Sequence, residues 1–408
     1  MIRILHSSDW HLGRFLYGRS LLEDQEYILS RLLELIDARQ PHALFLAGDI
    51  FDRSFPPEDA VMLLNSFLNA TIHQRKLPIF LIPGNHDSAE RVGFAAQLLR
   101  EQNLTIFSRI EDALNPVPLV GDHGSTAMVY GIPFVEPVII ARLLDKPELR
   151  THDEAIRALC ERISLEHQSR YPGVPSILLC HAFVVGGESS ESEKELSIGG
   201  SSQVDARAFA PFAYTALGHL HKPQNVGSPK IRYSGSLLPY SKSEVGHSKS
   251  ITEVVFTPTS ETGSTETKIM FHPLKSLRGL AYKEDSIENL LRDAEILQRS
   301  TDSMLVKTLD DFLIVGLTNV GGVLDAFARL RIFYPNLLHV ARAGGFESKL
   351  LPSSKAHQAE QRSELDLFAE FFKDATGENL SDEERATLIN CLMEPELAFA
   401  TSKQRGKK

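Results

Sequence analysis

The segment IFLIPGNHD, residues 79–87, joins a short apolar run to a loop that carries an amide, an imidazole and a carboxylate. Four apolar residues followed by a Pro-Gly pair predict a buried strand that ends in a turn. Asn85, His86 and Asp87 then lie together just beyond the end of that strand. Because such side chains can bind a metal ion, transfer a proton or only form hydrogen bonds, the loop alone leaves their roles open.

Four other apolar runs end in polar residues of the same kind. The motifs that follow them are Asp9-x-His11, Gly48-Asp49, Cys180-His181 and Gly218-His219-x-His221. One such motif is weak evidence, because a single Asp or His at a strand end is usually solvated or hydrogen-bonded. Five of them, each after an apolar run, predict a shared site at the edge of the sheet where the strands end.

The first 110 residues alternate apolar strands with amphipathic helices, which is the pattern of a parallel sheet. The helices are predicted at 20–39 and 58–74. The strands of this part and of the middle of the chain are predicted at 2–5, 43–49, 79–82, 126–132, 176–183 and 213–221. Two later segments with alternating polarity, 230–236 and 251–256, are expected to be antiparallel strands.

The composition narrows the class of protein. The 408 residues are too many for one ordinary core, so we expect two or three domains. A net charge of -10 gives no general attraction to nucleic acid or to anionic membranes, so any polyanion must be held locally. The three cysteines are widely spaced and predict neither a disulfide framework nor a zinc knuckle. Since no apolar run approaches about 18 residues, we expect a cytoplasmic protein that does not span a membrane.

The residue types at the predicted strand ends suit a pair of metal ions. Asp9-x-His11 sends two side chains in the same direction from an extended segment, so both can bind one ion. Asp49, in a loop tightened by Gly48, is the natural carboxylate to bridge two ions. Mixed imidazole and carboxylate ligands suit Mn, Fe or Zn, whereas Mg prefers oxygen ligands. Two ions about 3.5–4 Å apart promote displacement at phosphorus, which favours hydrolysis of a phosphoester.

The motifs DWHLG, GDIFD, GNHD, LLCH and GHLH resemble the five motifs of the calcineurin-like metallophosphoesterases. The resemblance implies an α/β fold, a two-sheet αββα sandwich with a small α/β capping domain and C-terminal helices. It implies two divalent metal ions, in the first place Mn, with Mg, Fe or Zn as alternatives. The first ion would be bound by Asp9, His11, Asp49 and His221, and the second by Asp49, Asn85, His181 and His219.

The same resemblance separates the adjacent residues of the GNHD loop by role. His86 matches the family histidine that contacts the scissile phosphate and can protonate the leaving 3′-oxygen. Asp87 would orient His86, as carboxylates commonly do for catalytic imidazoles. Some relatives have a histidine where this chain has Asp52, so the second histidine that assists the phosphate is missing here or another group replaces it.

Longer stretches extend the resemblance over nearly the whole chain, namely HSSDWHLG, GDIFDRSFPP, PGNHDS, LGHLHKPQ and YSGSLLPYSKSE. They are similar to nuclease subunits of bacterial DNA-processing complexes within this family. The resemblance implies a metal-dependent DNA nuclease for end processing, repair and recombination. Its activities would be 3′–5′ exonuclease on duplexes and endonuclease on single strands and hairpins. The implied partners besides DNA are an SMC-like ATPase and a second copy of the nuclease subunit.

Four segments are expected along the chain. They are a phosphoesterase domain at 1–271, a capping or DNA-binding domain at 272–348, C-terminal helices at 356–400 and a basic, disordered tail at 401–408. The apolar residues Leu365, Phe368 and Phe372 recur at the spacing of one helix face. Such a face suits docking to a helical partner, which is the role expected for the C-terminal helices toward the ATPase.

Two other functions remain open at this point. One is a phosphatase or cyclic-nucleotide phosphodiesterase on the same dinuclear site, and the other is a non-catalytic adapter of the ATPase. Protein phosphatases of the family carry GDxxDRG and GNHE, whereas this chain has GDIFDRS and GNHD. Lys249, after the last motif, is expected either to contact a phosphate or to lie on the ordinary surface.

Overall fold

A computed structural model describes residues 1–193, 203–258, 265–318, 323–343 and 381. Its first sheet has the order β16 (Thr265–Pro273), β15 (Ser250–Pro258), β1 (Ile2–Ser7), β4 (Ala43–Ala47), β5 (Ile79–Ile82) and β6 (Leu104–Ile106). Strands β1, β4, β5 and β6 are parallel to one another, as the sequence predicted. Strand β15 is antiparallel to both β1 and β16, so the prediction for 251–256 is also confirmed.

The second sheet has the order β13 (Gln224–Val226), β14 (Ser228–Tyr233), β12 (Tyr214–Gly218), β9 (Ser176–His181), β8 (Thr126–Ile132) and β7 (Val117–Val120). Strands β8, β9, β12 and β14 are parallel. The prediction that 230–236 is an antiparallel strand is therefore confirmed for one neighbour and wrong for the other. The short strand β13 reverses the chain before β14, so β14 is antiparallel to β13 but runs in the same direction as β12.

The alternation of side chains along the strands produces two separate faces on each sheet. In the first sheet, Ile4 and Phe45 belong to a buried cluster that also contains Ile177 and Leu179 of the second sheet. This shared cluster shows that the two sheets lie face to face. Their neighbours Leu5 and Leu44 belong instead to the cluster formed with the helices on the outer face of the first sheet.

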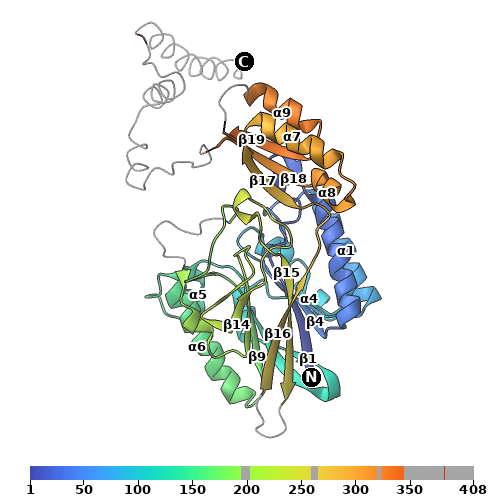
Figure 1. Cartoon of the computed structure of the whole chain (residues 1–408). Coiled ribbons are helices and arrows are strands. Elements are labelled where there is room, and N and C mark those ends of the chain that lie inside the picture. Colours follow the sequence, from blue (N-terminus) through green and yellow to red (C-terminus); the bar gives the residue numbers. More distant parts are fainter. Residues whose placement is uncertain (194–202, 259–264, 319–322, 344–380, 382–408) are drawn as a thin grey trace, which may run out of the picture. The chain divides into compact units, whose positions relative to one another are not determined.

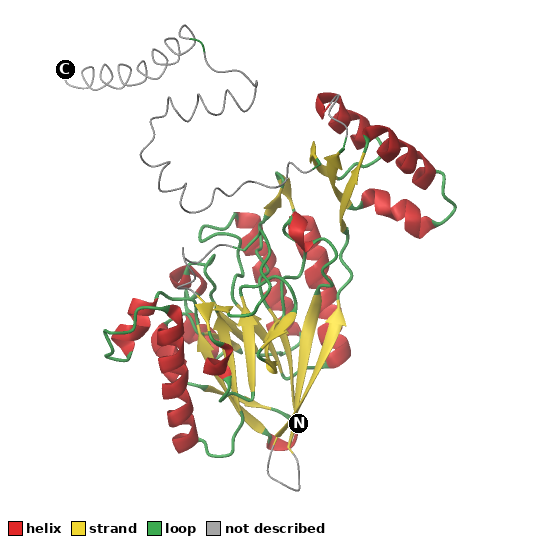
Figure 2. Cartoon of the chain, turned by 60° about the vertical axis from the view of Figure 1, so that its left-hand side comes forward, coloured by secondary structure: helices red, strands yellow, loops and turns green. Residues whose placement is uncertain are grey.

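Helices cover the outer faces of both sheets (Figures 1 and 2). Helix α1 (Leu22–Arg39) and helix α2 (Glu58–Leu68), which continues as a π-helix at Asn69–Gln74, pack on the first sheet. Helix α5 (Pro137–Leu143) and helix α6 (His152–Arg170) pack on the second. Residues of two short helices, α3 (Ala89–Val92) and α4 (Ala96–Arg100), pack on the cluster beneath α1. The predicted αββα sandwich is thus confirmed.

A separate, smaller sheet follows β16. It consists of the parallel strands β17 (Leu280–Asp285), β18 (Phe312–Leu317) and β19 (Leu337–Arg342), with α7 (Ile287–Gln298), α8 (Ser303–Lys307) and α9 (Val323–Arg331) between them. These elements share their own apolar cluster. In the segment between β16 and β17, Arg278 donates to Asp24 and to Glu23 of α1, each at 2.7 Å.

The C-terminal helices and the basic tail lie outside the described residues, so these expectations stay predictions. Residues 1–343 form one compact unit. The proposed boundary near residue 272 also stays a prediction, although β16 ends at Pro273 and β17 begins at Leu280. Within the described residues, no helix is both long and apolar enough to cross a bilayer.

The contact between the two sheets predicts that two leucine substitutions have very different effects on the free energy of unfolding. Leu179→Ala removes a fully buried side chain between the sheets and should lower the free energy of unfolding by about 2–5 kcal/mol. Leu165→Ala, on the exposed face of α6, should change it by less than about 0.5 kcal/mol. Chemical denaturation measures both values. Equal effects would show that the inner faces of the sheets do not form the core.

Candidate active site

Every predicted site residue follows or ends a parallel strand. Those of the first sheet follow β1, β4 and β5, and those of the second sheet follow or end β12 and β9. The residues concerned are Asp9, His11, Asp49, Asn85, His86, Asp87, His181, His219 and His221. The structure therefore brings together the carboxyl ends of strands from two sheets, whereas the sequence predicted the edge of one. His181 Nδ1 lies 2.9 Å from the carbonyl oxygen of Ala47, which links β9 to the end of β4.

Four site residues have left-handed backbone conformations that side chains normally disfavour. The φ angles are 54° at Asp9, 45° at His11, 50° at Asp49 and 112° at His219. Each such residue costs about 1–2 kcal/mol, so surrounding contacts must hold it. The N–H groups of Asp9 and His11 donate to the carbonyl groups of Gly48 and Asp49, each at 3.0 Å. Backbone strain that is held in this way is typical of functional sites.

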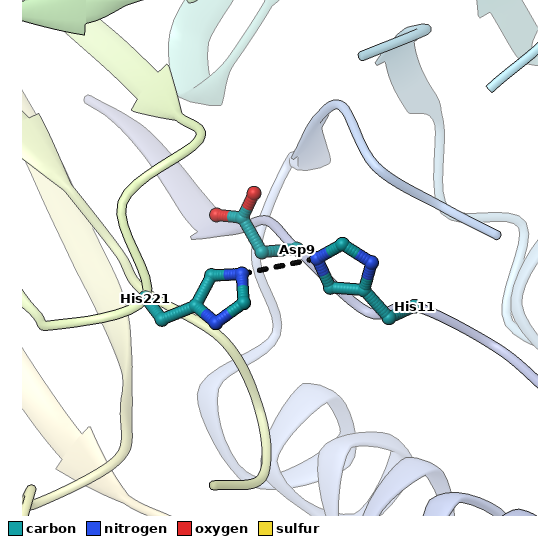
Figure 3. A group of neighbouring side chains, drawn as sticks. All are labelled: Asp9, His11 and His221. Carbon is teal, nitrogen blue, oxygen red and sulfur yellow. Dashed lines mark hydrogen bonds between the residues drawn. The ribbon is translucent and has the colours of Figure 1, made fainter. Parts of the chain in front are cut away.

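Asp9, His11 and His221 form one cluster of possible ligands, which we call the Asp9 group. One ligand atom from each lies within 4.8 Å of the others, and all three residues are buried. The two imidazoles face each other with 3.0 Å between their Nε2 atoms, beside the Asp9 carboxylate (Figure 3). Asp9 Oδ1 also accepts the N–H of His219 at 2.9 Å, which links the Asp9 group to the next cluster.

Asn85, His181 and His219 form a second cluster, the Asn85 group. Asn85 Oδ1 lies 2.9 Å from His181 Nε2 and 3.1 Å from His219 Nδ1. Its Nδ2 atom is buried without a hydrogen-bond partner among the described residues, so the side chain directs its oxygen toward the two imidazoles. Asp49 lies between the groups, because its Oδ2 atom is 3.5 Å from His181 Nε2 and 3.7 Å from His11 Nε2.

Burial and mutual charge determine which of these groups are neutral. Burial lowers the pKa of His219 to about 3 and holds the pKa of His11 well below its usual range. Burial alone would lower the pKa of His181, but the neighbouring Asp49 raises it to about 9. Burial alone would likewise raise the pKa of Asp49, but His181 and His11 hold it well below its usual range. Burial raises the pKa of Asp9 to about 6.

These residues fit a pair of divalent metal ions. Neutral imidazoles have an unprotonated nitrogen that can bind an ion, and the low pKa values of His11 and His219 keep both rings neutral. The carboxylate of Asp49 is within reach of both groups and carries the charge that two cations require. Nitrogen ligands mixed with carboxylates suit Mn, Fe or Zn. Cys180, next to His181, is a buried thiol whose pKa burial raises to about 12, so it adds no thiolate.

His86 is buried beside the Asp9 group. Its ring meets that of His11 edge to face, with 4.6 Å between the ring centroids. Its Nδ1 atom lies 2.7 Å from the main-chain carbonyl oxygen of Asp52. A carbonyl oxygen can only accept, so Nδ1 carries a hydrogen and Nε2 is the atom that gains or loses the proton. This arrangement fits a proton donor that acts through Nε2.

Asp87 contacts main-chain groups of two loops, and its expected role in orienting His86 stays a prediction. Its carboxylate accepts the N–H groups of Ile50 at 3.0 Å, Phe51 at 2.9 Å and Gly84 at 2.9 Å. Asp87 thus joins the loop after β5 to the loop that carries Asp49, while the contact at the Nδ1 atom of His86 comes from the main chain of Asp52. Burial, together with the charge of Asp49, raises the pKa of Asp87 to about 7.

Asp52 and Arg14 form an ion pair at the rim of the site. Asp52 Oδ1 accepts from Arg14 Nη1 at 2.8 Å and lies 3.8 Å from His11 Nδ1. The Arg14 guanidinium also donates to the carbonyl oxygen of Ser192 at 3.3 Å. At the position of the second family histidine, the chain therefore has a carboxylate that fixes an arginine close to His11.

Sequence reasoning missed the residues behind His221. Glu244 is buried and accepts from Lys249 Nζ at 2.5 Å, while His221 Nδ1 lies 3.1 Å from its other oxygen. Lys249 is buried as well, so the alternative that it lies on the ordinary surface was wrong. Burial alone would raise the pKa of Glu244, but His221 and Lys249 hold it well below its usual range. The motif YSGSLLPYSKSE, which ends at Glu244, was the available signal.

The comparison with known proteins agrees with this geometry. The family model for calcineurin-like phosphoesterases matches residues 2–223, which include the two groups and His86. The chain belongs to the calcineurin-like phosphoesterases. Within this family it is similar to the SbcD subunit of the SbcCD nuclease from Staphylococcus epidermidis, with 30% identity over 380 residues. That match covers 93% of this chain and 95% of the staphylococcal protein, so it extends well beyond the phosphoesterase motifs.

The solved structures that resemble this chain are more distant. The protein TT1561 of Thermus thermophilus is 15% identical with a TM-score of 0.35, covering 65% of this chain and 98% of its own. A dimetal phosphatase from Danio rerio is 10% identical with a TM-score of 0.42, covering 68% of this chain and 98% of its own.

The contacts of Asp87 predict that it stabilises the fold. Asp87→Asn replaces an oxygen acceptor by an amide donor that would face main-chain N–H groups, so the free energy of unfolding should fall by about 2–3 kcal/mol. Denaturation in the presence of a chelator measures this without a contribution from bound metal. Asp37→Asn, which breaks an exposed pair with Arg75, is the control and should cost less than about 1 kcal/mol. If the Asp87→Asn protein is as stable as the unchanged protein, Asp87 does not hold the two loops together, and orienting His86 remains its only expected role.

Proposed function

We propose that the protein is a metal-dependent DNA nuclease that hydrolyses phosphodiester bonds with two divalent ions, most suitably Mn. The observation that carries the proposal is the position of Asp49 between two clusters of buried ligands, with His86 beside one of them. Asp9, His11, His221 and Asp49 would hold one ion, and Asn85, His181, His219 and Asp49 the other. Bound there, the ions would lower the pKa of an attacking water and neutralise charge on the phosphate.

The chain's own residues supply the remaining chemistry. His86 donates a proton from Nε2 to the leaving 3′-oxygen, while the carbonyl group of Asp52 accepts from Nδ1 and stabilises the protonated ring. Asp87 keeps the loops after β4 and β5 together, so that Asp49 and His86 stay at a fixed separation. The main-chain N–H of His86 donates to Asp49 Oδ1 at 2.8 Å. The residue that donates the proton is therefore bonded directly to the bridging carboxylate.

DNA is a better substrate for this site than a phosphoprotein or a cyclic nucleotide. The similarity to an SbcCD nuclease subunit covers 93% of the chain and so includes segments outside the phosphoesterase core. The motifs GDIFDRS and GNHD also differ from those of the protein phosphatases. The relative is one subunit of a complex, which supports an SMC-like ATPase as the partner of this chain, with 356–400 as its docking segment. The activities proposed are 3′–5′ exonuclease on duplexes and endonuclease on single strands and hairpins, in DNA repair and recombination.

The proposal is tested with purified protein, Mn, end-labelled linear DNA and, in parallel, a nitrophenyl phosphomonoester. DNA should be cleaved and the monoester should be a poor substrate. His86→Gln should lower cleavage about 10²–10⁴-fold while Mn binding, measured by calorimetry, is retained. His73→Gln, an exposed histidine of the π-helix, is the control and should cleave like the unchanged protein.

Three outcomes would contradict this assignment. Undiminished cleavage by His86→Gln would exclude this residue as the proton donor. Preference for the monoester would indicate a phosphatase. Mn binding without hydrolysis of either substrate would favour a non-catalytic adapter.

We also propose that two copies associate through the surface around α3 and α4. Phe94 and Leu98 are 79% and 74% exposed, and Phe55 lies under the guanidinium of Arg91, 4.0 Å from ring centroid to Cζ. Met62 of α2 is exposed as well. Large apolar side chains gathered in this way typically mark a protein–protein contact. A second copy is the occupant expected here, because the family resemblance implies a pair of nuclease subunits.

Leu98→Asp should convert the dimer to a monomer, because a carboxylate would be buried without a partner in the interface. Light scattering after size-exclusion chromatography measures the mass. Leu165→Asp, at an equally exposed leucine on α6, should leave the dimer intact. A monomeric unsubstituted protein, or a dimer that survives Leu98→Asp, would rule out this surface.

A further inference from the structure

His221 is held at three separate points. Its main-chain N–H donates to Glu193 Oε1 at 2.6 Å. Its carbonyl oxygen accepts from Lys249 Nζ at 2.8 Å. Its ring atom Nδ1 lies 3.1 Å from Glu244 Oε1 and 2.7 Å from Ser192 Oγ. These contacts fix both the main chain and the ring of His221, so the ring has a single orientation.

The contact at Nδ1 also determines the tautomer. Ser192 Oγ donates to Glu244 Oε1 at 2.5 Å, so its only hydrogen is used there and the hydroxyl oxygen can accept from the ring. The ionised carboxylate is an acceptor too, so Nδ1 must carry the hydrogen. Nε2 then keeps its lone pair, and this is the atom that faces His11 Nε2 at 3.0 Å beside Asp9 (Figure 3).

Lys249 allows a carboxylate to remain charged at this depth. Glu244 is 1% exposed, and burial of an ionised carboxylate without a cation would be prohibitive. The ammonium group donates to Glu244 Oε2 at 2.5 Å, Ser236 Oγ at 2.8 Å and the carbonyl oxygen of His221 at 2.8 Å, so all three of its hydrogens are used. It binds the oxygen that points away from the imidazole and leaves Oε1 for His221.

Two other imidazoles, those of His181 and His11, have weaker support on the side away from the cluster. His181 Nδ1 meets the neutral carbonyl group of Ala47. His11 Nδ1 is buried with no hydrogen-bond partner in the described part of the chain, and the nearest carboxylate, Asp52, is 3.8 Å away. A carboxylate at the second nitrogen makes an imidazole a stronger metal ligand than a carbonyl group does.

We propose that Glu244, kept ionised by Lys249, is a positioning residue for His221 and that it makes the Asp9 group the tighter of two unequal metal sites. The inference rests on the proposed dinuclear site and adds a residue and an order of affinity to it. Nothing in this assignment requires Glu244 to touch a metal ion or the substrate.

The test is a titration of the full-length, metal-free protein with Mn, in which electron paramagnetic resonance counts the free ion. The unchanged protein should bind two ions with clearly separated dissociation constants. Glu244→Gln should weaken the tighter site about 10- to 100-fold and leave the weaker one unchanged, so that the two constants converge. A failure of the proposed dinuclear site looks different, because the unchanged protein would then bind no pair of ions at all, and a failure of the nuclease assignment appears only in the cleavage assay.

Glu253→Gln is the matched control. Glu253 is also a fully buried carboxylate, bound by Arg3, Arg39 and His272, and none of these partners belongs to the site. This substitution should lower the melting temperature without changing either Mn constant. Wild-type Mn constants in Glu244→Gln, or an equal loss in Glu253→Gln, would overturn the positioning role.

A second measurement needs no substitution and keeps the proposal testable if Glu244→Gln does not fold. Crystals of the unchanged protein with one equivalent of Mn should show an anomalous peak at the Asp9 group. A stronger peak at the Asn85 group, or equal peaks at both, would contradict the proposed order of affinity.

Discussion

The site depends on how closely the two sheets approach each other where β4 and β12 end. A Cβ atom on Gly218 would lie 1.8 Å from the carbonyl oxygen of Ala47, so main chain meets main chain with no side chain between. A Cβ atom on Gly84 would similarly lie 2.3 Å from Asp49 Oδ1. Because glycines stand at these points, Asp49 of one sheet reaches His181 of the other. Larger residues would separate the two halves of the site.

That close approach concentrates polar groups where they are almost completely buried. Asp9 and Asp49 are 0% and 2% exposed, and ionised carboxylates at this depth need cations or several donors. The protein supplies donors from backbone N–H groups and from histidines, but within the described residues it places its nearby cations, Arg14 and Lys249, on other carboxylates. Asp9 and Asp49 thus form no salt bridge with an arginine or lysine among the described residues.

Much of this could be predicted from the sequence, because local patterns report local structure. Apolar runs that end in ligand-type residues identified the strand ends, and the helix expected at 20–39 is present as α1. Which sheet each strand joins depends on contacts between distant segments, such as Ala47 and His181, 134 positions apart. The same limit applies to Glu244 and Lys249, which look like ordinary surface residues until the fold buries them behind His221. For Asp87 the resemblance suggested a contact with His86, whereas the structure shows its carboxylate on the main-chain N–H groups of Ile50, Phe51 and Gly84.

The hydrogen bond between His86 and Asp52 uses a main-chain oxygen, and this has an evolutionary consequence. Every amino acid offers that carbonyl group, so mutation at position 52 can change the side chain without releasing the imidazole, provided that the loop keeps its path. A residue other than aspartate at position 52 would therefore keep the same hydrogen bond to the His86 ring. The side chain is free to diverge, and here it has become the anchor of Arg14.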